Sequence, residues 1–168
     1  MFQTLIASST VGSGGASSIT FSSIPATFTD LTLVLSARAT STTATITIAF
    51  NGSGNDFYGL YMQGNGSTAS TTNQTTFIGN ACISSDTANT FGNLRVFIPN
   101  YAGSAQKAFS VDSVTENNGT TAFAQLFATT WQNTAAINQI TLNLANFAQN
   151  STAYLYGTLK GSGGGTIS

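Results

Sequence analysis

Alternation of apolar and polar residues is the feature that most constrains how this chain can fold. In residues 31–37, leucine or alanine occupies every second position, and in residues 43–50 alanine, isoleucine and phenylalanine alternate mainly with threonine. Because successive side chains of a β-strand point to opposite faces, each run predicts a strand with one face turned toward a core.

Similar apolar runs recur at short spacing and bring the predicted total to about nine strands. The further candidates are residues 2–8, 18–24, 75–83, 94–98, 108–114, 123–131, 140–144 and 153–159. An amphipathic helix is an alternative for residues 133–146, but their threonines, asparagines and alternating apolar residues favour a strand. Short strands separated by turn signals such as Asn51-Gly52 predict an all-β, antiparallel β-sandwich of jelly-roll type. An immunoglobulin-like sandwich is the second choice, because it uses only about 100 residues.

The length of the chain, 168 residues, suits a single domain. At that size about 70% of the unfolded surface is buried on folding, so the core needs neither a disulfide nor a metal. We expect a single β-sandwich domain over residues 1–160 and a flexible, glycine-rich tail over residues 161–168. The lone Cys82 cannot form an internal disulfide, and we expect it to be buried as a small hydrophobe.

The scarcity of charge is the most informative feature of the composition. Charged residues make up 5% of the chain, and the formal net charge is −1. Soluble domains usually carry about 25% charged residues. Such weak charge repulsion favours a protein that is destined for a stable assembly. With no basic patch we expect no nucleic-acid partner, and with no long apolar stretch we expect no membrane partner.

The residues for catalysis are missing, because the chain has no histidine. We therefore predict no enzyme, no catalytic residues, no cofactor and no metal site. Asp112 and Glu116 are the remaining pair of carboxylates, but they flank a strand end and are expected to pair with a cation. The candidate cations are Arg38, Arg95 and Lys107. Asp56 lies in a loop that resembles an oxygen-rich calcium loop, but the loop lacks the acidic spacing, and a turn is the alternative.

Aromatic residues offer a different kind of site. Residues 57–62 are rich in aromatics and are followed by a polar segment, 63–74, that reads as a loop. The two interpretations are a hairpin packed on the core and an interaction loop that meets a neighbouring subunit or stacks on a sugar. The residues proposed for the interaction loop are Phe57, Tyr58, Tyr61 and Trp131.

Three segments resemble a known group of proteins. Residues 18–31, 93–110 and 116–122 are similar to small Ser/Thr/Asn-rich virion structural proteins of tailed bacteriophages of aquatic bacteria, including cyanophages. The resemblance covers most of the chain and rests on composition rather than on a catalytic motif. It implies a location in the virion, assembled in the host cytoplasm, and it brings no catalytic residues.

The expected function follows from the resemblance and the low charge. We expect a capsid decoration (cement) protein that stabilises the head surface, because a short domain without a shaft is suited to covering a surface. The alternative is a receptor-binding tail-fibre or other tail component that recognises a host-surface glycan. The expected partners are other virion proteins, above all the major capsid protein, and further copies of the chain. Closed symmetry is expected from the uncharged edges, and a homotrimer by analogy with phage surface proteins.

Overall fold

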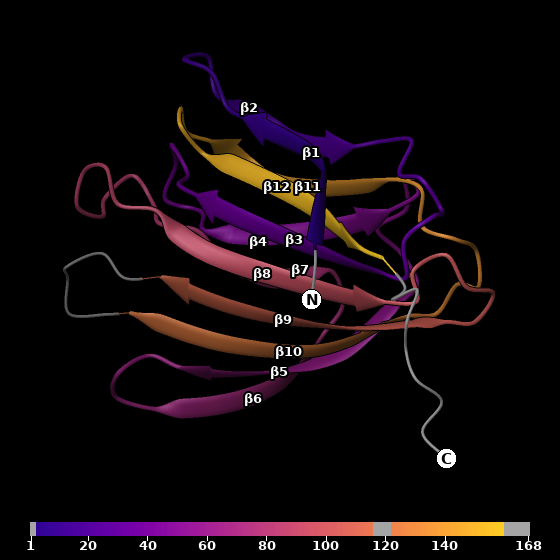
Figure 1. The fold of residues 1–168 in the computed structure, drawn as a ribbon. Helices are drawn as coiled ribbons and strands as arrows, with labels where there is room; N and C mark the ends of the chain where they lie inside the picture. Colours follow the sequence, from indigo (N-terminus) through magenta and orange to yellow (C-terminus); the bar gives the residue numbers. More distant parts are fainter. Residues whose placement is uncertain (1–2, 116–121, 160–168) are drawn as a thin grey trace.

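Twelve strands build the part of the chain that the computed structural model describes, residues 3–115 and 122–159 (Figure 1). The strands are β1 (Gln3–Thr10), β2 (Ala16–Phe21), β3 (Asp30–Ala37), β4 (Thr45–Phe50), β5 (Phe57–Gly64), β6 (Ala69–Gln74), β7 (Phe77–Asn80), β8 (Gly92–Pro99), β9 (Lys107–Thr115), β10 (Phe123–Trp131), β11 (Ile140–Phe147) and β12 (Thr152–Thr158). These residues contain no helix that could cross a membrane. The antiparallel β-sandwich is confirmed, with twelve strands in place of about nine. The predicted tail, residues 161–168, lies outside the described residues.

Eight of the strands pair from the two ends of the chain inward. Strand β1 pairs with β12, β2 with β11, β3 with β8 and β4 with β7, all antiparallel. Successive pairs alternate between a sheet that contains β1-β12-β3-β8 and a four-stranded sheet in the order β2-β11-β4-β7. An antiparallel ribbon wrapped in this way is a jelly roll, the type of sandwich that the short strands and turn signals predicted.

The other four strands enlarge only one of the two sheets. Its full order is β1-β12-β3-β8-β9-β10-β5-β6, so β9, β10, β5 and β6 continue the sheet beyond the jelly roll (Figure 1). Strand β7 of the smaller sheet packs on β9 and β10. The last strand, β6, has five of its six residues exposed. The larger sheet therefore ends in a hairpin that the smaller sheet hardly covers.

The core lies between the two sheets and is formed by the inward half of each alternating strand. Leu31, Leu33 and Leu35 of β3 are fully buried, as the alternation predicted. At one end of the core, an aromatic cluster surrounds Phe50, whose ring centroid lies 5.3–5.4 Å from those of its neighbours. These neighbours are Phe57, Phe109 and Trp131. Full burial of such side chains stabilises the fold by about 1.5–3 kcal/mol each. Cys82 is also buried, as expected.

Residues 63–74, predicted to be a loop, instead form the end of β5, a tight turn and β6. The Asn65 side-chain oxygen accepts hydrogen bonds from the backbone N–H groups of Ser67 and Thr68 at 3.0 and 2.8 Å, which closes the turn. Threonine favours extended backbone, and three of the six β6 residues are threonine or serine. The alternating pattern is absent because neither face of β6 is buried.

Two of the three candidate cations, Lys107 and Arg38, donate to backbone carbonyls. Lys107 is 2% exposed, and its Nζ lies 5.8 Å from the centroid of the Trp131 ring. It donates at 2.6–2.9 Å to the carbonyl oxygens of Gly103, Ala105 and Thr134. Burial lowers the pKa of the Lys107 ammonium. The Arg38 guanidinium donates at 2.9–3.1 Å to the carbonyl oxygens of Thr87, Thr90 and Asp86. Both cations thus fix loops at the ends of the sandwich.

Candidate functional site

Large exposed apolar side chains gather on one surface, the side of the eight-stranded sheet that faces away from the four-stranded sheet. We call this side the outer face. Its exposed apolar residues include Val34, Tyr58, Leu60, Met62, Val114, Leu126 and Tyr154. The strand register places several of them in one row across the sheet. The row runs through Tyr154, Val34, Arg95, Asp112, Leu126, Met62 and Thr71. Within this row, the apolar residues Leu126 and Met62 are direct neighbours. Contiguous exposed apolar surface marks interaction sites in soluble proteins.

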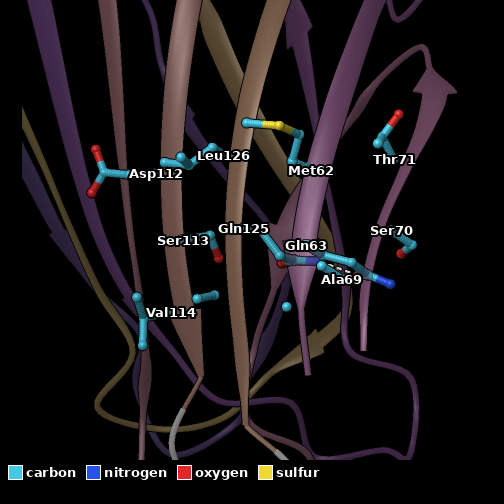
Figure 2. A pocket seen from close by; sticks show the side chains of 12 residues that line it. Met62, Gln63, Ala69, Ser70, Thr71, Asp112, Ser113, Val114, Gln125 and Leu126 are labelled. Carbon is cyan, nitrogen blue, oxygen red and sulfur yellow. Dashed lines mark hydrogen bonds between the residues drawn. The ribbon is translucent and has the colours of Figure 1, made fainter. Parts of the chain in front are cut away.

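The outer face is hollowed where β9, β10, β5 and β6 cross it. A groove of about 480 Å³ lies there, with Met62, Leu126 and Val114 among its apolar side chains (Figure 2). Short residues between them, Gly64 and Ala124, leave the space open. A neighbouring hollow of about 330 Å³ shares Met62 and Leu126. The outer face is therefore a shaped surface on which a partner can seat apolar groups.

Two residues of opposite charge occupy neighbouring strands near the middle of the outer face. Arg95 of β8 and Asp112 of β9 are directly opposed in the register, and Asp112 lines the groove beside Leu126 (Figure 2). Directly opposed residues of an antiparallel pair have their Cβ atoms about 4.5–5.5 Å apart, so two side chains of opposite charge extend from neighbouring positions here. Behind the groove, Gln125 Nε2 donates to Gln63 Oε1 at 3.1 Å, which ties β10 to β5 from the inner side.

The four aromatic residues proposed for an interaction loop lie in strands and are not brought together on one surface. Tyr58 is exposed on the outer face of β5. Phe57 and Trp131 are 5% and 1% exposed and belong to the aromatic cluster of the core. Tyr61 is half-buried on the inner face, with its ring stacked 5.2 Å from that of Phe127. Of the four, Tyr58 is placed to meet a partner, whereas the others match the interpretation as a hairpin packed on the core.

Leu60, Met62 and Leu126 are among the outer-face residues that sequence reasoning did not propose for a site. Residues 123–131 are apolar on both strand faces, and residues 57–62 carry apolar residues at both alternating sets of positions. A strand that is apolar on both faces is either covered on both or exposes one of them. Apolar residues on both strand faces were the sequence signal for an exposed apolar surface. The order of strands in the sheet was needed to decide which of the two faces is exposed.

The candidate calcium residue, Asp56, is a turn residue directly before β5. It is exposed and adopts the left-handed conformation with φ of 67°, and its carbonyl oxygen accepts a hydrogen bond from the Gln132 N–H at 2.7 Å. In residues 3–115 and 122–159, no group of three or more histidine, cysteine, aspartate or glutamate side chains is gathered as metal ligands. Glu116, which forms the remaining pair of carboxylates with Asp112 in the sequence, lies outside these residues.

Comparisons of the chain with protein-family models, with curated proteins and with solved structures find no match in any of the three. Function is therefore inferred from the residues and geometry of the outer face.

Proposed function

We propose that this protein is a non-enzymatic structural protein of a phage virion and that it coats the head surface as a decoration protein. The observation that carries the proposal is the uncovered apolar outer face of the larger sheet. Its side chains are not needed to close the core, because the inner face of the same strands already supplies one. A partner that covers Leu60, Met62 and Leu126 would remove their exposed apolar surface from water, which is favourable at about 25 cal/mol per Å².

The shape of the molecule supports a covering role. The eight-stranded sheet presents one broad face, and the described residues form a single sandwich without a coiled-coil or repetitive shaft. The low net charge, −1, lets copies approach one another on a crowded surface with little repulsion. We include the major capsid protein and further copies of this chain among the partners. We propose that the copies associate with closed symmetry. The three-fold form of that symmetry rests on the analogy with phage surface proteins alone.

Copy number in purified particles tests the proposal. Quantitative mass spectrometry of gradient-purified virions should find hundreds of copies per particle. The protein should also rebind to heads that lack it, and the Leu126→Lys variant should rebind poorly because a charge would enter the apolar contact. A few dozen copies located on tails would contradict the decoration role.

A receptor-binding tail component is the second candidate, and the groove favours it. Sugar rings bind through apolar faces together with a few well-placed polar groups, and the groove combines Met62 and Leu126 with the Asp112 carboxylate. A glycan array with host-surface polysaccharides tests this function. Binding that is lost in Asp112→Asn would support it, whereas no binding would leave decoration as the function.

The absence of catalysis is part of the proposal and has its own test. The chain contains no histidine to serve as a general base, and Asp112 is the carboxylate that lines the groove. Incubation with host-surface glycans should release no reducing ends. Glycan cleavage that is lost in Asp112→Asn would revive a carboxylate-dependent hydrolase and contradict the proposal.

A further inference from the structure

Strand β6 ends the larger sheet, and it differs from the other three sheet edges. The other edges are β1, β2 and β7. The register of β1 on β12 shifts between Leu5 and Ala7, and the ladder of β2 on β11 is interrupted between Asn143 and Phe147. Strand β7 has four residues and a register shift against β4. By contrast, β6 pairs with β5 along all six of its residues without a shift.

Irregularity at an edge has a known purpose. Proteins protect sheet edges from pairing with another chain by bulges, short strands, charged residues or proline. Strand β6 has none of these, because its residues 69–74 are uncharged and include no proline. In the described part of the chain, no strand pairs with the edge of β6 that points away from β5. Its N–H and C=O groups on that side are therefore available to an added strand.

The hairpin holds this edge in a fixed position. At one end, Gln74 Nε2 donates to Thr129 Oγ1 of β10 at 2.5 Å, reaching across β5. Gly59 makes that approach feasible, because a Cβ at this position would lie 2.7 Å from Thr129 Oγ1 and 2.9 Å from Gln74 Nε2. At the other end, the Asn65 side chain closes the turn. An edge that is already extended loses little conformational freedom when it pairs, which favours binding.

We propose that β6 is a pairing edge and that two copies of this chain join antiparallel through it, so that one continuous sheet runs through both. A second copy fits because an antiparallel strand pairs with itself across a two-fold axis, with Thr71 near its own copy. Neither β5 nor β6 carries a charge, so the approach of two such edges meets no local repulsion. Met62 and Leu60 lie one strand inward, and pairing would join the two apolar outer faces into one band. The contact is independent of the location in the virion, and it replaces the three-fold symmetry expected by analogy with a two-fold contact.

Native mass over a concentration series tests the contact on the full chain. Light scattering coupled to size exclusion should show a shift from 17.3 kDa toward twice that mass as the concentration rises. Amide hydrogen exchange should slow in residues 69–74 over the same range. A monomer at every soluble concentration would overturn the proposal, and so would a trimer.

Charge variants test the edge itself. Thr71→Lys would place like charges close together across the axis and should weaken the dimer by roughly fivefold or more. The matched control is Ser18→Lys, which adds the same charge to an exposed position of the edge strand β2 and should dimerise like the wild type. Mixing Thr71→Lys with Thr71→Asp should restore a dimer of one copy of each, a result that a merely misfolded variant would not give. Dimerisation of Thr71→Lys at the wild-type concentration would overturn the proposal.

Discussion

The inner and outer faces of the eight-stranded sheet carry apolar side chains of similar size, yet only the inner face is covered by the second sheet. Neighbouring residues of one strand show the contrast: Phe127 of β10 is 3% exposed and Leu126 is 55% exposed. In β3, Leu33 is fully buried whereas the adjacent Val34 is 37% exposed. The inner face accounts for folding. The outer face also carries large apolar side chains, among polar and charged ones, without that role, and this is why we propose that it contacts other molecules.

The largest expected difference between the faces is in stability. Phe127→Ala removes a ring that packs on Tyr61 and Phe77, and it should lower the free energy of unfolding by about 3–5 kcal/mol. Leu126→Ala, one residue away on the outer face, should change it by about 0.5 kcal/mol or less. Urea denaturation of both variants measures the two values. Equal losses would mean that the outer face belongs to the fold, and the contrast between the faces would fail.

Substituting the cations of the two faces should produce a smaller difference in the free energy of unfolding. Lys107→Met would leave the carbonyl oxygens of Gly103, Ala105 and Thr134 without their buried donor, at a cost of about 1–3 kcal/mol in the free energy of unfolding. Arg95→Met changes an exposed cation of the outer face and should alter stability by about 0.5 kcal/mol or less. Thermal or urea unfolding at neutral pH separates the two. A neutral effect of Lys107→Met would show that water replaces the lysine at no cost.

The smallest effect is expected in alkaline solution. Burial raises the pKa of the Tyr101 phenol above its ordinary value of 10.0. As the pH rises through about 10, the unfolded chain loses this proton before the folded protein does, so the stability that Tyr101 contributes below pH 10 is progressively lost. The lowered pKa of Lys107 acts in the opposite direction, and a comparison with Tyr101→Phe therefore isolates the phenol.

The alkaline experiment compares the wild type with one variant. Tyr101→Phe should lose less stability than the wild type between pH 10 and pH 11. Urea unfolding at a series of pH values provides the measurement. A Tyr101→Phe profile that matches the wild type would show that the buried phenol does not set the alkaline response.

The sequence predicted the inner face better than the outer one, for a physical reason. Burial of one face forces alternation on a strand, and the runs at residues 31–37 and 140–144 were correctly read for that reason. Strand β6 was missed because it buries only Gln74, so its composition resembles that of a loop. In β10 both faces are apolar, and the order of strands, a non-local property, decides that Phe127 turns inward and Leu126 outward.

The candidate site was predictable only in part for the same reason. The clustering of aromatics pointed to residues 57–62, but it could not separate the exposed Tyr58 from the buried Phe57 beside it. The carbonyl partners of the two buried or loop-binding cations, Lys107 and Arg38, could not be predicted from the sequence either. Their partners lie in loops that the fold brings together across as many as 52 positions in the chain.

Oxidation of Met62 tests most directly whether the outer face is a contact surface. This side chain is 56% exposed and lines the groove, and its thioether reacts with dilute peroxide when solvent can reach it. The purified protein and intact virions would be treated in parallel, and the sulfoxide at Met62 measured by mass spectrometry. We expect rapid oxidation of the free protein and strong protection in the virion. Equal oxidation rates in the two would contradict it, because the outer face would then remain open to solvent after assembly.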